Sequence, residues 1–454
     1  MININIPITA LATPPGIGGI AVIRVSGKGT FEIVDEIFTG KIKLIDAKSH
    51  TIHYGKIFNN DILIDTVTCS VFKSPNSYTG EDVVEISCHG GMIISQEIIN
   101  LLISIGVRLA EPGEFTKRAF LNGKMDLLQV EAVADLIHSI SIKSEQTSAR
   151  QLIGGLSLRF AELRKQLIDI CSLLELELDF SEEDVEFVDK SGIKLKIGEV
   201  IDYCDSLLQF QKGSEILRSG YMVGIAGYPN SGKSTFFNAL LNKERAIVSH
   251  IAGTTRDYLE ETIYIKDLPV RIIDTAGIRE TEDVIEIEGI KFVEKLLNQS
   301  NMILIINDIS ISDNNSDELI KNINSKYPDR EVAIIQNKID LKPIELDKQK
   351  DYKEFFISAK GSIGIEEIKN NIYDKALIST DRVNDIILNQ RHSLILKNAS
   401  EFLRNAINAI DLQMENEVIS IEIRTAIKTL GEITGETYSE DILNNIFSNF
   451  CIGK

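Results

Sequence analysis

Gly227-Tyr-Pro-Asn-Ser-Gly-Lys-Ser234 is the stretch of this chain that decides its fold. It fits the pattern G-x-x-x-x-G-K-[ST], in which a glycine-rich loop directs backbone N–H groups at a phosphate. The apolar run Met222–Ala226 precedes the loop, and a helical pattern opens at Thr235. This is the context that a phosphate-binding loop requires, because the amino terminus of a helix adds a positive end. The stretch therefore predicts a nucleotide site on an α/β fold.

Residues of this loop carry the expected contacts to the phosphates. Lys233 is expected to neutralise oxygens of the β- and γ-phosphates, and the hydroxyl of Ser234 to bind Mg²⁺. The set predicted to contact the phosphates is Asn230, Ser231, Gly232, Lys233, Ser234 and Thr235.

A second motif follows the strand predicted at Arg271–Ile273. Asp274 is expected to hold a water bound to Mg²⁺, and the amide of Gly277 to meet the γ-phosphate, which makes the next segment a switch. The predicted nucleotide contacts here are Asp274, Thr275, Ala276 and Gly277.

Two further motifs select guanine. Asp340, after the strand predicted at Val332–Ile335, can accept the N1–H and 2-amino hydrogens of guanine, which adenine lacks. Lys338 can lie across the base, and the motif after the strand predicted at Phe355–Ile357 suits a backbone contact to the guanine carbonyl. The predicted residues are Asn337, Lys338, Asp340, Ser358, Ala359 and Lys360. Because each motif follows a strand, and ligands bind at the carboxyl ends of parallel strands, the four together predict a GTPase.

The catalytic machinery is less complete than the binding motifs. Thr255, within Gly253-Thr-Thr-Arg-Asp257, is expected to complete the Mg²⁺ shell. Ile278 follows Gly277, so a glutamine that orients water is absent from its usual place. Either catalysis is weak, or another residue and another positive charge substitute. Candidate residues are Glu280, Glu282, Asp283, Glu286 and Glu288.

Hydrophobic periodicity predicts how the chain is organised. Strands alternating with helices between Tyr221 and Leu377 predict a parallel sheet covered on both faces. Helical stripes on either side, Leu156–Leu174 and Leu396–Met414, predict that this unit is inserted into a helical domain. The predicted domains are an α/β domain at 1–120, a helical domain at 121–215 and 379–454, and a nucleotide-binding domain at 216–378. The fold class is thus α/β and α.

Composition excludes several classes of protein. The chain has 454 residues, and 48 Lys and Arg against 67 Asp and Glu give a net charge of −19. A basic coat for nucleic acid is therefore not expected, and any contact to RNA would be a local patch. Five scattered cysteines, no signal peptide and no long apolar run predict a soluble cytoplasmic protein that does not enter a membrane.

Motifs outside the nucleotide site complete a resemblance to the MnmE (TrmE) family of tRNA modification GTPases. They are Thr13-Pro-Pro-Gly16 with Gly18-Gly19, Tyr78-Thr-Gly-Glu-Asp82, His89-Gly-Gly91, Pro112-Gly-Glu-Phe-Thr116, Arg118-Ala-Phe-Leu-Asn-Gly-Lys124 and the ending Phe450-Cys-Ile-Gly-Lys454. The nucleotide motifs alone would also fit GTPases of the Era/EngA type, so these motifs single out the family.

The resemblance implies a homodimer whose amino-terminal domain binds a folate, 5-formyl- or methylene-tetrahydrofolate. It implies a heterotetramer-type complex with MnmG, a flavoprotein. The pair would add an aminomethyl or carboxymethylaminomethyl group at C5 of the wobble uridine of certain tRNAs. Hydrolysis would be activated when the GTP-binding domains dimerise.

The resemblance also implies site residues. K⁺ would take the place of an arginine finger, with Asn230, Ser249, Ile251 and Thr254 as its ligands. Glu286 would position the attacking water, with Lys233 and Asp274 as the other catalytic residues. The implied folate site comprises Arg24, Glu81, Lys124 and Lys454. Cys451 is a candidate site residue without an assigned role.

Two other hypotheses remain open from the residues. One is a GTPase switch in ribosome assembly or signalling, without one-carbon chemistry. The other is a nucleotide-dependent scaffold, which predicts GTP binding without K⁺-accelerated turnover. Folate binding by the amino-terminal domain would distinguish the modification enzyme from the GTPase switch, which has no one-carbon chemistry.

Overall fold

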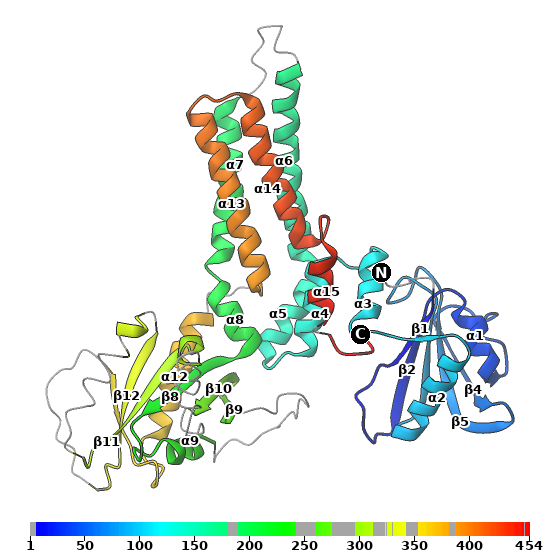
Figure 1. Ribbon diagram of the computed structural model, residues 1–454, viewed down its shortest axis with the longest axis horizontal. Coiled ribbons are helices and arrows are strands. Elements are labelled where there is room, and N and C mark those ends of the chain that lie inside the picture. The colour runs from blue at the N-terminus through cyan, green and yellow to red at the C-terminus, as the bar shows by residue number, and fades with distance from the viewer. Residues whose placement is uncertain are drawn as a thin grey trace, which may run out of the picture. The chain divides into compact units, whose positions relative to one another are not determined.

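The computed structural model describes residues 6–179, 189–241, 259–274, 296–311, 323, 325–328, 330–341, 353–380, 386–448 and 450–454. The chain forms two compact units (Figure 1). The first comprises residues 1–137, 149–205 and 394–454, and the second residues 138–148 and 206–393.

The first unit begins with a seven-stranded sheet. Its elements are β1 (Ile8–Leu11), β2 (Ile20–Ser26), α1 (Thr30–Ile37), β3 (Phe38–Gly40), β4 (Thr51–Asn59), β5 (Ile62–Phe72), β6 (Val83–His89), α2 (Met92–Ser104) and β7 (Arg108–Leu109). The strand order is β3-β4-β5-β6-β2-β1-β7, antiparallel except for the parallel pair β1 and β7. Alternate residues of β2, including Ile23 and Val25, are buried in one core with residues of α1 and α2. Since side chains alternate along a strand, Val22 and Arg24 lie on the opposite face.

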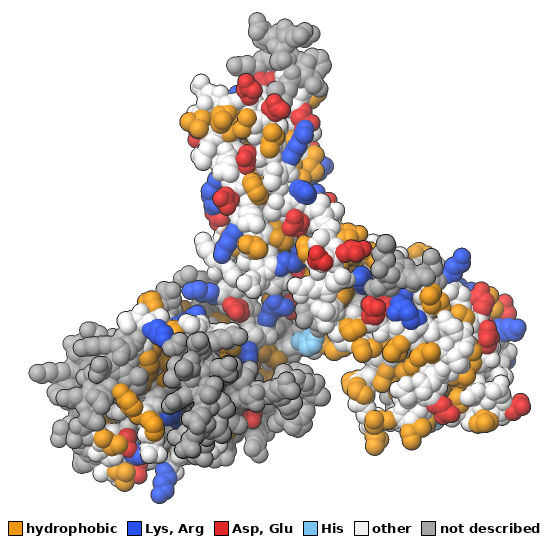
Figure 2. Space-filling view, in the orientation of Figure 1, with side chains coloured by type: hydrophobic (Ala, Val, Ile, Leu, Met, Phe, Trp, Pro, Cys, Tyr) orange, Lys and Arg blue, Asp and Glu red, His pale blue; other side chains and the backbone are white. Residues whose placement is uncertain are grey.

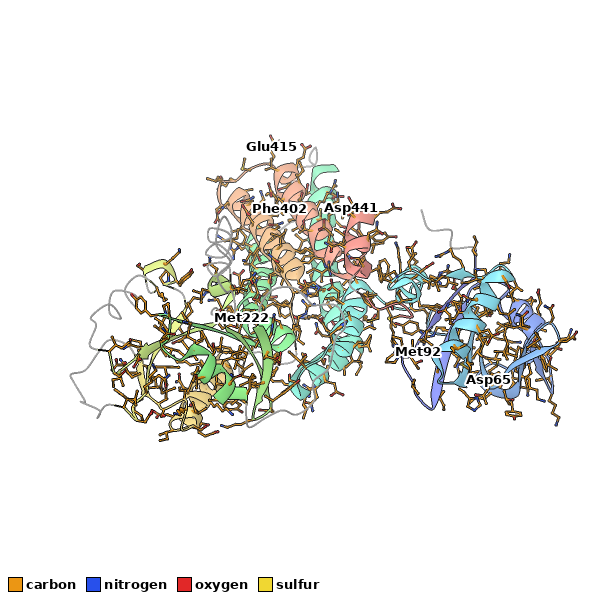
Figure 3. All side chains as sticks on the ribbon, turned by 60° about the horizontal axis from the view of Figure 1, so that its bottom comes forward. Asp65, Met92, Met222, Phe402, Glu415 and Asp441 are labelled. Carbon is orange, nitrogen blue, oxygen red and sulfur yellow. The ribbon has the colours of Figure 1, made fainter. Side chains whose placement is uncertain are left out.

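A buried carboxylate holds the turn after β6. Asp65, labelled in Figure 3, accepts hydrogen bonds from the backbone N–H of His89 at 2.8 Å and from its ring Nδ1 at 2.7 Å. Burial alone would raise the pKa of Asp65, but the hydrogen bonds from His89 and Thr66 outweigh it and lower that pKa. The pair positions the start of the Gly90-Gly91 turn that leads into α2.

Helices form the rest of the first unit and cross into the second. They are α3 (Glu114–Leu121), α4 (Leu127–Ile137), α5 (Ile142–Leu152), α6 (Gly155–Asp179), α7 (Lys190–Leu208), α13 (Gln390–Asp411), α14 (Asn416–Thr434) and α15 (Glu440–Ser448). Helices α6 and α14 pack side by side, and Arg164 Nε donates to the carbonyl of Ile427 at 3.1 Å. The stripe predicted on α6 is buried. The apolar stripe predicted for Leu396–Met414 is wrong at its last residue. Helix α13 ends at Asp411, and Met414 is exposed.

The second unit is built on a six-stranded sheet. Its elements are α8 (Gln211–Ser219), β8 (Tyr221–Gly227), α9 (Lys233–Leu241), β9 (Leu259–Ile265), β10 (Leu268–Asp274), β11 (Met302–Asp308), β12 (Glu331–Asn337), β13 (Lys353–Phe356) and α12 (Ile365–Thr380). The order is β13-β12-β11-β8-β10-β9, and only β9 is antiparallel to its neighbour. The last strand ends one residue before the predicted Ile357. The sequence analysis missed β9, whose Glu260 and Glu261 interrupt an apolar run at the sheet edge.

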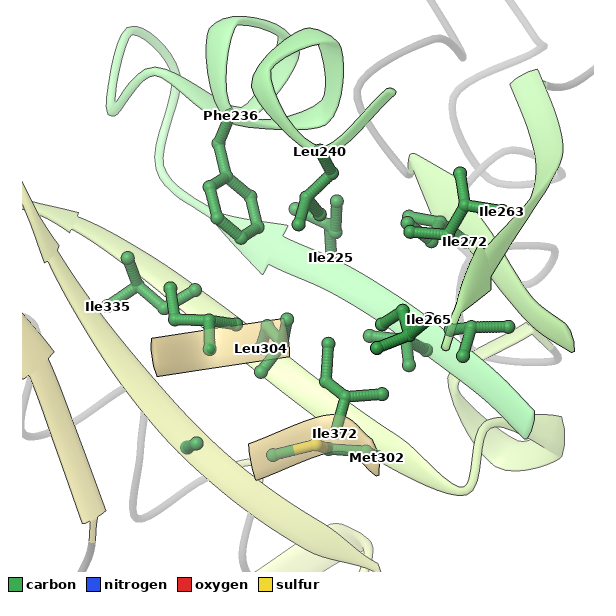
Figure 4. Packing of buried hydrophobic residues seen from close by; sticks show 14 of the residues in the cluster. Ile225, Phe236, Leu240, Ile263, Ile265, Ile272, Met302, Leu304, Ile335 and Ile372 are labelled. Carbon is green, nitrogen blue, oxygen red and sulfur yellow. The ribbon is translucent and has the colours of Figure 1, made fainter. Parts of the chain in front are cut away.

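Both faces of this sheet are covered. Phe236 and Leu240 of α9 and Ile372 of α12 pack with Leu304 of β11 in one core (Figure 4). The next residues along β11, Ile303 and Ile305, belong to a second core with Leu297 and Tyr327. Strands buried on both faces have continuous apolar sequences, which is why they were predictable. The predicted α/β unit inserted between helical segments is confirmed.

Candidate functional site

The phosphate loop joins β8 to α9 through backbone conformations that restrict its residues. Gly227 and Gly232 have φ of 145° and 97°, and Asn230 has φ of 62°. A Cβ at Gly227 would collide with the carbonyl of Ile306, and one at Gly232 with the amide nitrogen of Asn337. Glycine is required at both positions, because the loop passes against neighbouring strand ends.

Lys233 is the first residue of α9 and folds back over the loop. Its Nζ donates to the carbonyls of Gly227 and Tyr228, each at 2.8 Å. The hydroxyl of Ser231 is buried and has no hydrogen-bond partner among the described residues. The loop thus combines a helix amino terminus, a lysine and a buried polar atom, which fits a phosphate ligand.

Asn337 joins the loop to the guanine motifs. Its Nδ2 donates to the carbonyl of Ser231 at 3.0 Å, and its Oδ1 accepts from the backbone N–H of Ala359 at 3.0 Å. The buried side chain therefore connects three predicted motifs through two hydrogen bonds. Motifs more than 100 residues apart in the chain meet at one edge of the sheet.

Asp340 is held by the next motif. Ser358 Oγ donates to Asp340 Oδ1 at 2.6 Å, and the backbone N–H of Gly361 donates to Ser358 Oγ at 3.2 Å. The hydrogen bond from Ser358 lowers the pKa of Asp340, so the carboxylate is ionised at neutral pH. An ionised, oriented carboxylate is what recognition of two guanine donors requires. Lys360 belongs to the same turn after β13.

Asp308, at the end of β11, is a residue that the sequence analysis missed. Lys338 Nζ pairs with Asp308 Oδ2 and also donates to the carbonyl of Asn230 at 3.0 Å. Burial alone would raise the pKa of Asp308, but hydrogen bonds from Lys338 and Ser310 outweigh it and lower that pKa. The sequence contains one signal that could have identified Asp308: a charged residue at the end of an apolar strand, at the same sheet edge as the other motifs.

Replacing Asp308 with asparagine should weaken GTP binding about threefold to tenfold. Lys338 would lose the ionic partner that positions it, which should lower the binding free energy of GTP by about 1 kcal/mol. Fluorescent guanine nucleotides would measure the affinity, and Asp374→Asn on the exposed side of α12 is the matched control. Equal affinities in the two variants would contradict a positioning role for Asp308.

The same pair should make stability depend on pH. Because the pKa of Asp308 is lower in the folded than in the unfolded chain, its contribution is fully present above the unfolded pKa of about 3.9. It is lost as the pH falls through the folded pKa. The stability difference between wild type and Asp308→Asn should therefore shrink in acid.

The structure describes only part of the predicted catalytic set. Asp274 ends β10, and its backbone lies opposite Ile225 of β8, which brings it to the same sheet edge as the loop. Its side chain lies outside the described residues, as do Ser249, Ile251, Thr254, Thr255, Thr275, Ala276, Gly277 and Glu286. The roles of these residues stay predictions.

One segment, residues 74–82, connects the four residues of the predicted folate site: it contains one of them, and the other three lie beside it. The guanidinium of Arg24 lies 5.1 Å from the centroid of Tyr78, and Lys454 Nζ lies 6.0 Å from it. Lys124 Nζ donates to the carbonyl of Pro75 at 3.1 Å, and Glu81 belongs to the segment. The structure therefore brings together residues from both ends of the chain.

Arg24 also has protein partners of its own. Its Nε and Nη2 donate to Glu85 Oε1 at 2.9 and 2.8 Å, and its Nη1 donates to the carbonyl of Gly453 at 3.5 Å. Burial and the neighbouring Arg24 lower the pKa of Lys454. Cys451 is exposed, and its carbonyl accepts from the N–H of Gly113 at 3.5 Å. The chain ending is thus part of the same cluster.

Two of the amino-terminal motifs line a cavity of about 420 Å³. Residues 13–18, before β2, form one wall, and Gly90 with the first turns of α2 forms another. The N–H of Gly18 donates to the carbonyl of Gly90 at 2.9 Å. The motifs around Gly16 and His89 are therefore one structural feature.

The phosphate loop and three further motifs at strand ends define this chain as a P-loop GTPase. Family models match over most of the chain: "MnmE helical domain" at residues 127–451 and "GTP-binding protein TrmE N-terminus" at 7–124. The tRNA modification GTPase MnmE of Christiangramia forsetii is 44% identical, with 100% of each chain covered. The same-named protein of Cytophaga hutchinsonii is 42% identical, over 98% of this chain and 97% of its own. The chain belongs to the MnmE family and is a GTP hydrolase in tRNA modification.

A solved structure with a similar nucleotide domain is the G domain of the T. maritima FeoB iron transporter. It is 25% identical and covers 34% of this chain and 98% of its own, with a TM-score of 0.27. None of the helices in the part of the chain that the structure describes has the length and apolar character of a membrane span.

Proposed function

We propose that this chain hydrolyses GTP to drive formation of an aminomethyl or carboxymethylaminomethyl group at C5 of a tRNA wobble uridine, together with MnmG. The one-carbon unit comes from a tetrahydrofolate. The observation that carries the proposal is the gathering of Arg24, Glu81, Lys124 and Lys454 on one segment, in a chain whose relatives are tRNA modification GTPases.

In the nucleotide site, Lys233 neutralises charge on the β- and γ-phosphates, and Asp340 selects guanine. Ser234 and Thr255 would hold Mg²⁺, with Asp274 on a water of its shell, and the metal would supply positive charge to the phosphates. Glu286 would orient the attacking water.

A potassium ion is the proposed substitute for an arginine finger. The side chain of Asn230 is exposed, while its backbone carbonyl accepts from Lys338, so its amide oxygen is accessible to a cation. Asn230, Ser249, Ile251 and Thr254 would hold K⁺, which neutralises charge that develops at the γ-phosphate.

Replacing Asn230 with alanine should abolish most of the acceleration of GTP hydrolysis by K⁺, a loss of at least about tenfold. Rates would be measured in KCl and in NaCl at equal ionic strength. Hydrolysis as fast as wild type in KCl would remove Asn230 from the proposed site.

In the folate site, Glu81 accepts hydrogens from the pterin ring, and the cations Arg24, Lys124 and Lys454 pair with the glutamate tail. Bound 5-formyl- or methylene-tetrahydrofolate supplies the one-carbon unit. No role is proposed for Cys451 beyond its place beside this cluster.

Exposed apolar surface supports a homodimer. Figure 2 shows hydrophobic side chains gathered on the surface of the amino-terminal part of the first unit. Ile20, Ile52 and Tyr54 are exposed, and the strand register places them on the sheet face opposite α1 and α2. A second copy would cover this face.

The other proposed partners are MnmG and tRNA, which would bind through a local contact. The proposed domains are residues 1–120, residues 121–215 together with 379–454, and residues 216–378. We propose that the enzyme acts in the cytoplasm.

Mass spectrometry of tRNA nucleosides tests the function. A strain lacking the gene should lose aminomethyl-type wobble uridines, and the wild-type gene should restore them. An unchanged nucleoside profile would overturn the proposal and favour a GTPase switch without one-carbon chemistry.

A further inference from the structure

Four charged side chains alternate in sign through the interior next to the proposed folate site. Arg108 pairs with Glu114, Glu114 with Arg118, and Arg118 with Glu81. The side chains of Glu114 and Arg118 are only 1% and 2% exposed. The chain of charges begins at β7, passes through α3 and ends at the carboxylate proposed to bind the pterin ring.

Arg118 contacts both oxygens of that carboxylate. Its Nη1 lies 3.1 Å from Glu81 Oε1 and 3.3 Å from Oε2. Both oxygens of Glu81 therefore face the guanidinium of Arg118, which sets the direction of the carboxylate. The side chain of Glu81 is 15% exposed, so it is held while part of it stays accessible.

Ser26 is the other side-chain partner of Glu81 among the residues that the structure describes. Its Oγ donates to Glu81 Oε2 at 2.7 Å and also lies 2.8 Å from Thr79 Oγ1. A hydroxyl has one hydrogen, so Ser26 can give it either to Glu81 or to Thr79. Turning that hydrogen to Thr79 frees an acceptor site on Glu81 without breaking the pair with Arg118.

The rest of the network allows Arg118 to be buried. Its Nη2 donates to Glu114 Oε1 and to the carbonyl of Ile6, each at 3.0 Å. Burial alone would raise the pKa of Glu114, but hydrogen bonds from Arg108, Arg118 and a backbone N–H outweigh it and lower that pKa. Glu114 is therefore ionised at neutral pH and compensates one positive charge of the network, while Arg118 Nη1 contacts Glu81.

We propose that Arg118 is a positioning residue that aims the carboxylate of Glu81 at the 2-amino and N3 hydrogens of the pterin ring, with the Ser26 hydroxyl as the exchangeable partner. This rests on the proposed folate function. Arg118 acts through Glu81 and does not itself contact the ligand.

A merely structural role for Arg118 makes a different prediction. If the network only attaches α3 to the sheet, weakening it lowers affinity for every folate to the same extent. If Arg118 aims Glu81, the loss falls on ligands that carry both pterin donors. The ratio of two affinities separates these roles.

The test compares 5-formyl-tetrahydrofolate with its 2-desamino-2-methyl analogue, which lacks one donor, in equilibrium binding to the full chain. Wild type should prefer the natural ligand about tenfold or more, as expected for a hydrogen bond to a charged group. Arg118→Met should bring this preference to within about threefold. Arg118→Lys keeps the charge and the approximate length, so it should fold and retain an intermediate preference.

Arg404→Lys is the matched control, because Arg404 forms an exposed ion pair with Asp205 in the same unit. A thermal melt reports whether each variant is folded, and GTP binding reports that the second unit is intact. If folded Arg118→Lys keeps the full wild-type preference, or if Arg118→Met weakens both ligands equally, the positioning role is overturned. If wild type binds neither ligand, the folate function itself fails, which is a distinguishable result.

Discussion

Replacing Asp340 with asparagine should lower the affinity for GTP about 100-fold or more and create measurable affinity for XTP. The Asp340 carboxylate is ionised and held by Ser358, and it is expected to accept two guanine hydrogens. Each hydrogen bond to a charged group contributes about 1.5–3 kcal/mol, so the loss should amount to about 3 kcal/mol. Xanthine has an oxygen in place of the 2-amino group, and the asparagine amide can donate to it. Competition binding with GTP, ATP and XTP would measure the change.

The control for this substitution is Asp267→Asn. Asp267 is exposed in the turn between β9 and β10 of the same unit, so its change tests loss of charge without loss of base recognition. An Asp340→Asn protein that still prefers GTP over XTP as strongly as wild type would show that another residue reads the base.

Replacing Gly232 with alanine should abolish detectable GTP binding and hydrolysis. The new Cβ would overlap the Asn337 amide, which bridges the loop and Ala359, and the backbone has φ of 97°. Overpacking costs about 1–3 kcal/mol and the left-handed conformation about 1–2 kcal/mol. Because Asn337 cannot move without losing both hydrogen bonds, the strain falls on the site itself. Nucleotide binding and thermal unfolding would both be measured.

Gly106→Ala separates the two causes. Gly106 has φ of 102°, close to that of Gly232, but a Cβ there would meet no atom within 4 Å. The Gly106→Ala variant should therefore lose only the stability that the left-handed backbone conformation costs, and it should bind GTP as wild type does. If Gly232→Ala binds GTP as well as Gly106→Ala, contact with Asn337 is not what makes Gly232 necessary.

The nucleotide unit was predictable from local patterns. Met222–Ala226 and the other central strands are continuous apolar runs because both faces of the sheet are covered, and each run ends at a polar motif. The edge strand β9 was missed because it lacks this burial on both faces. Met414 was assigned to a helical stripe, but the helix ends before it, at Asp411. Spacing alone does not locate the end of a helix.

The sequence by itself determined the GTPase class, because parallel strands end at one edge and so place motifs such as Asn337 and Asp340 beside the phosphate loop. Only the tertiary structure decided that Asp308 pairs with Lys338, that Arg118 holds Glu81, and that Gly453 meets Arg24. These contacts join residues 30, 37 and 429 positions apart. Periodicity reports which face of an element is buried. It carries no information on which distant side chain will neutralise a buried charge, and that choice is made when the elements pack.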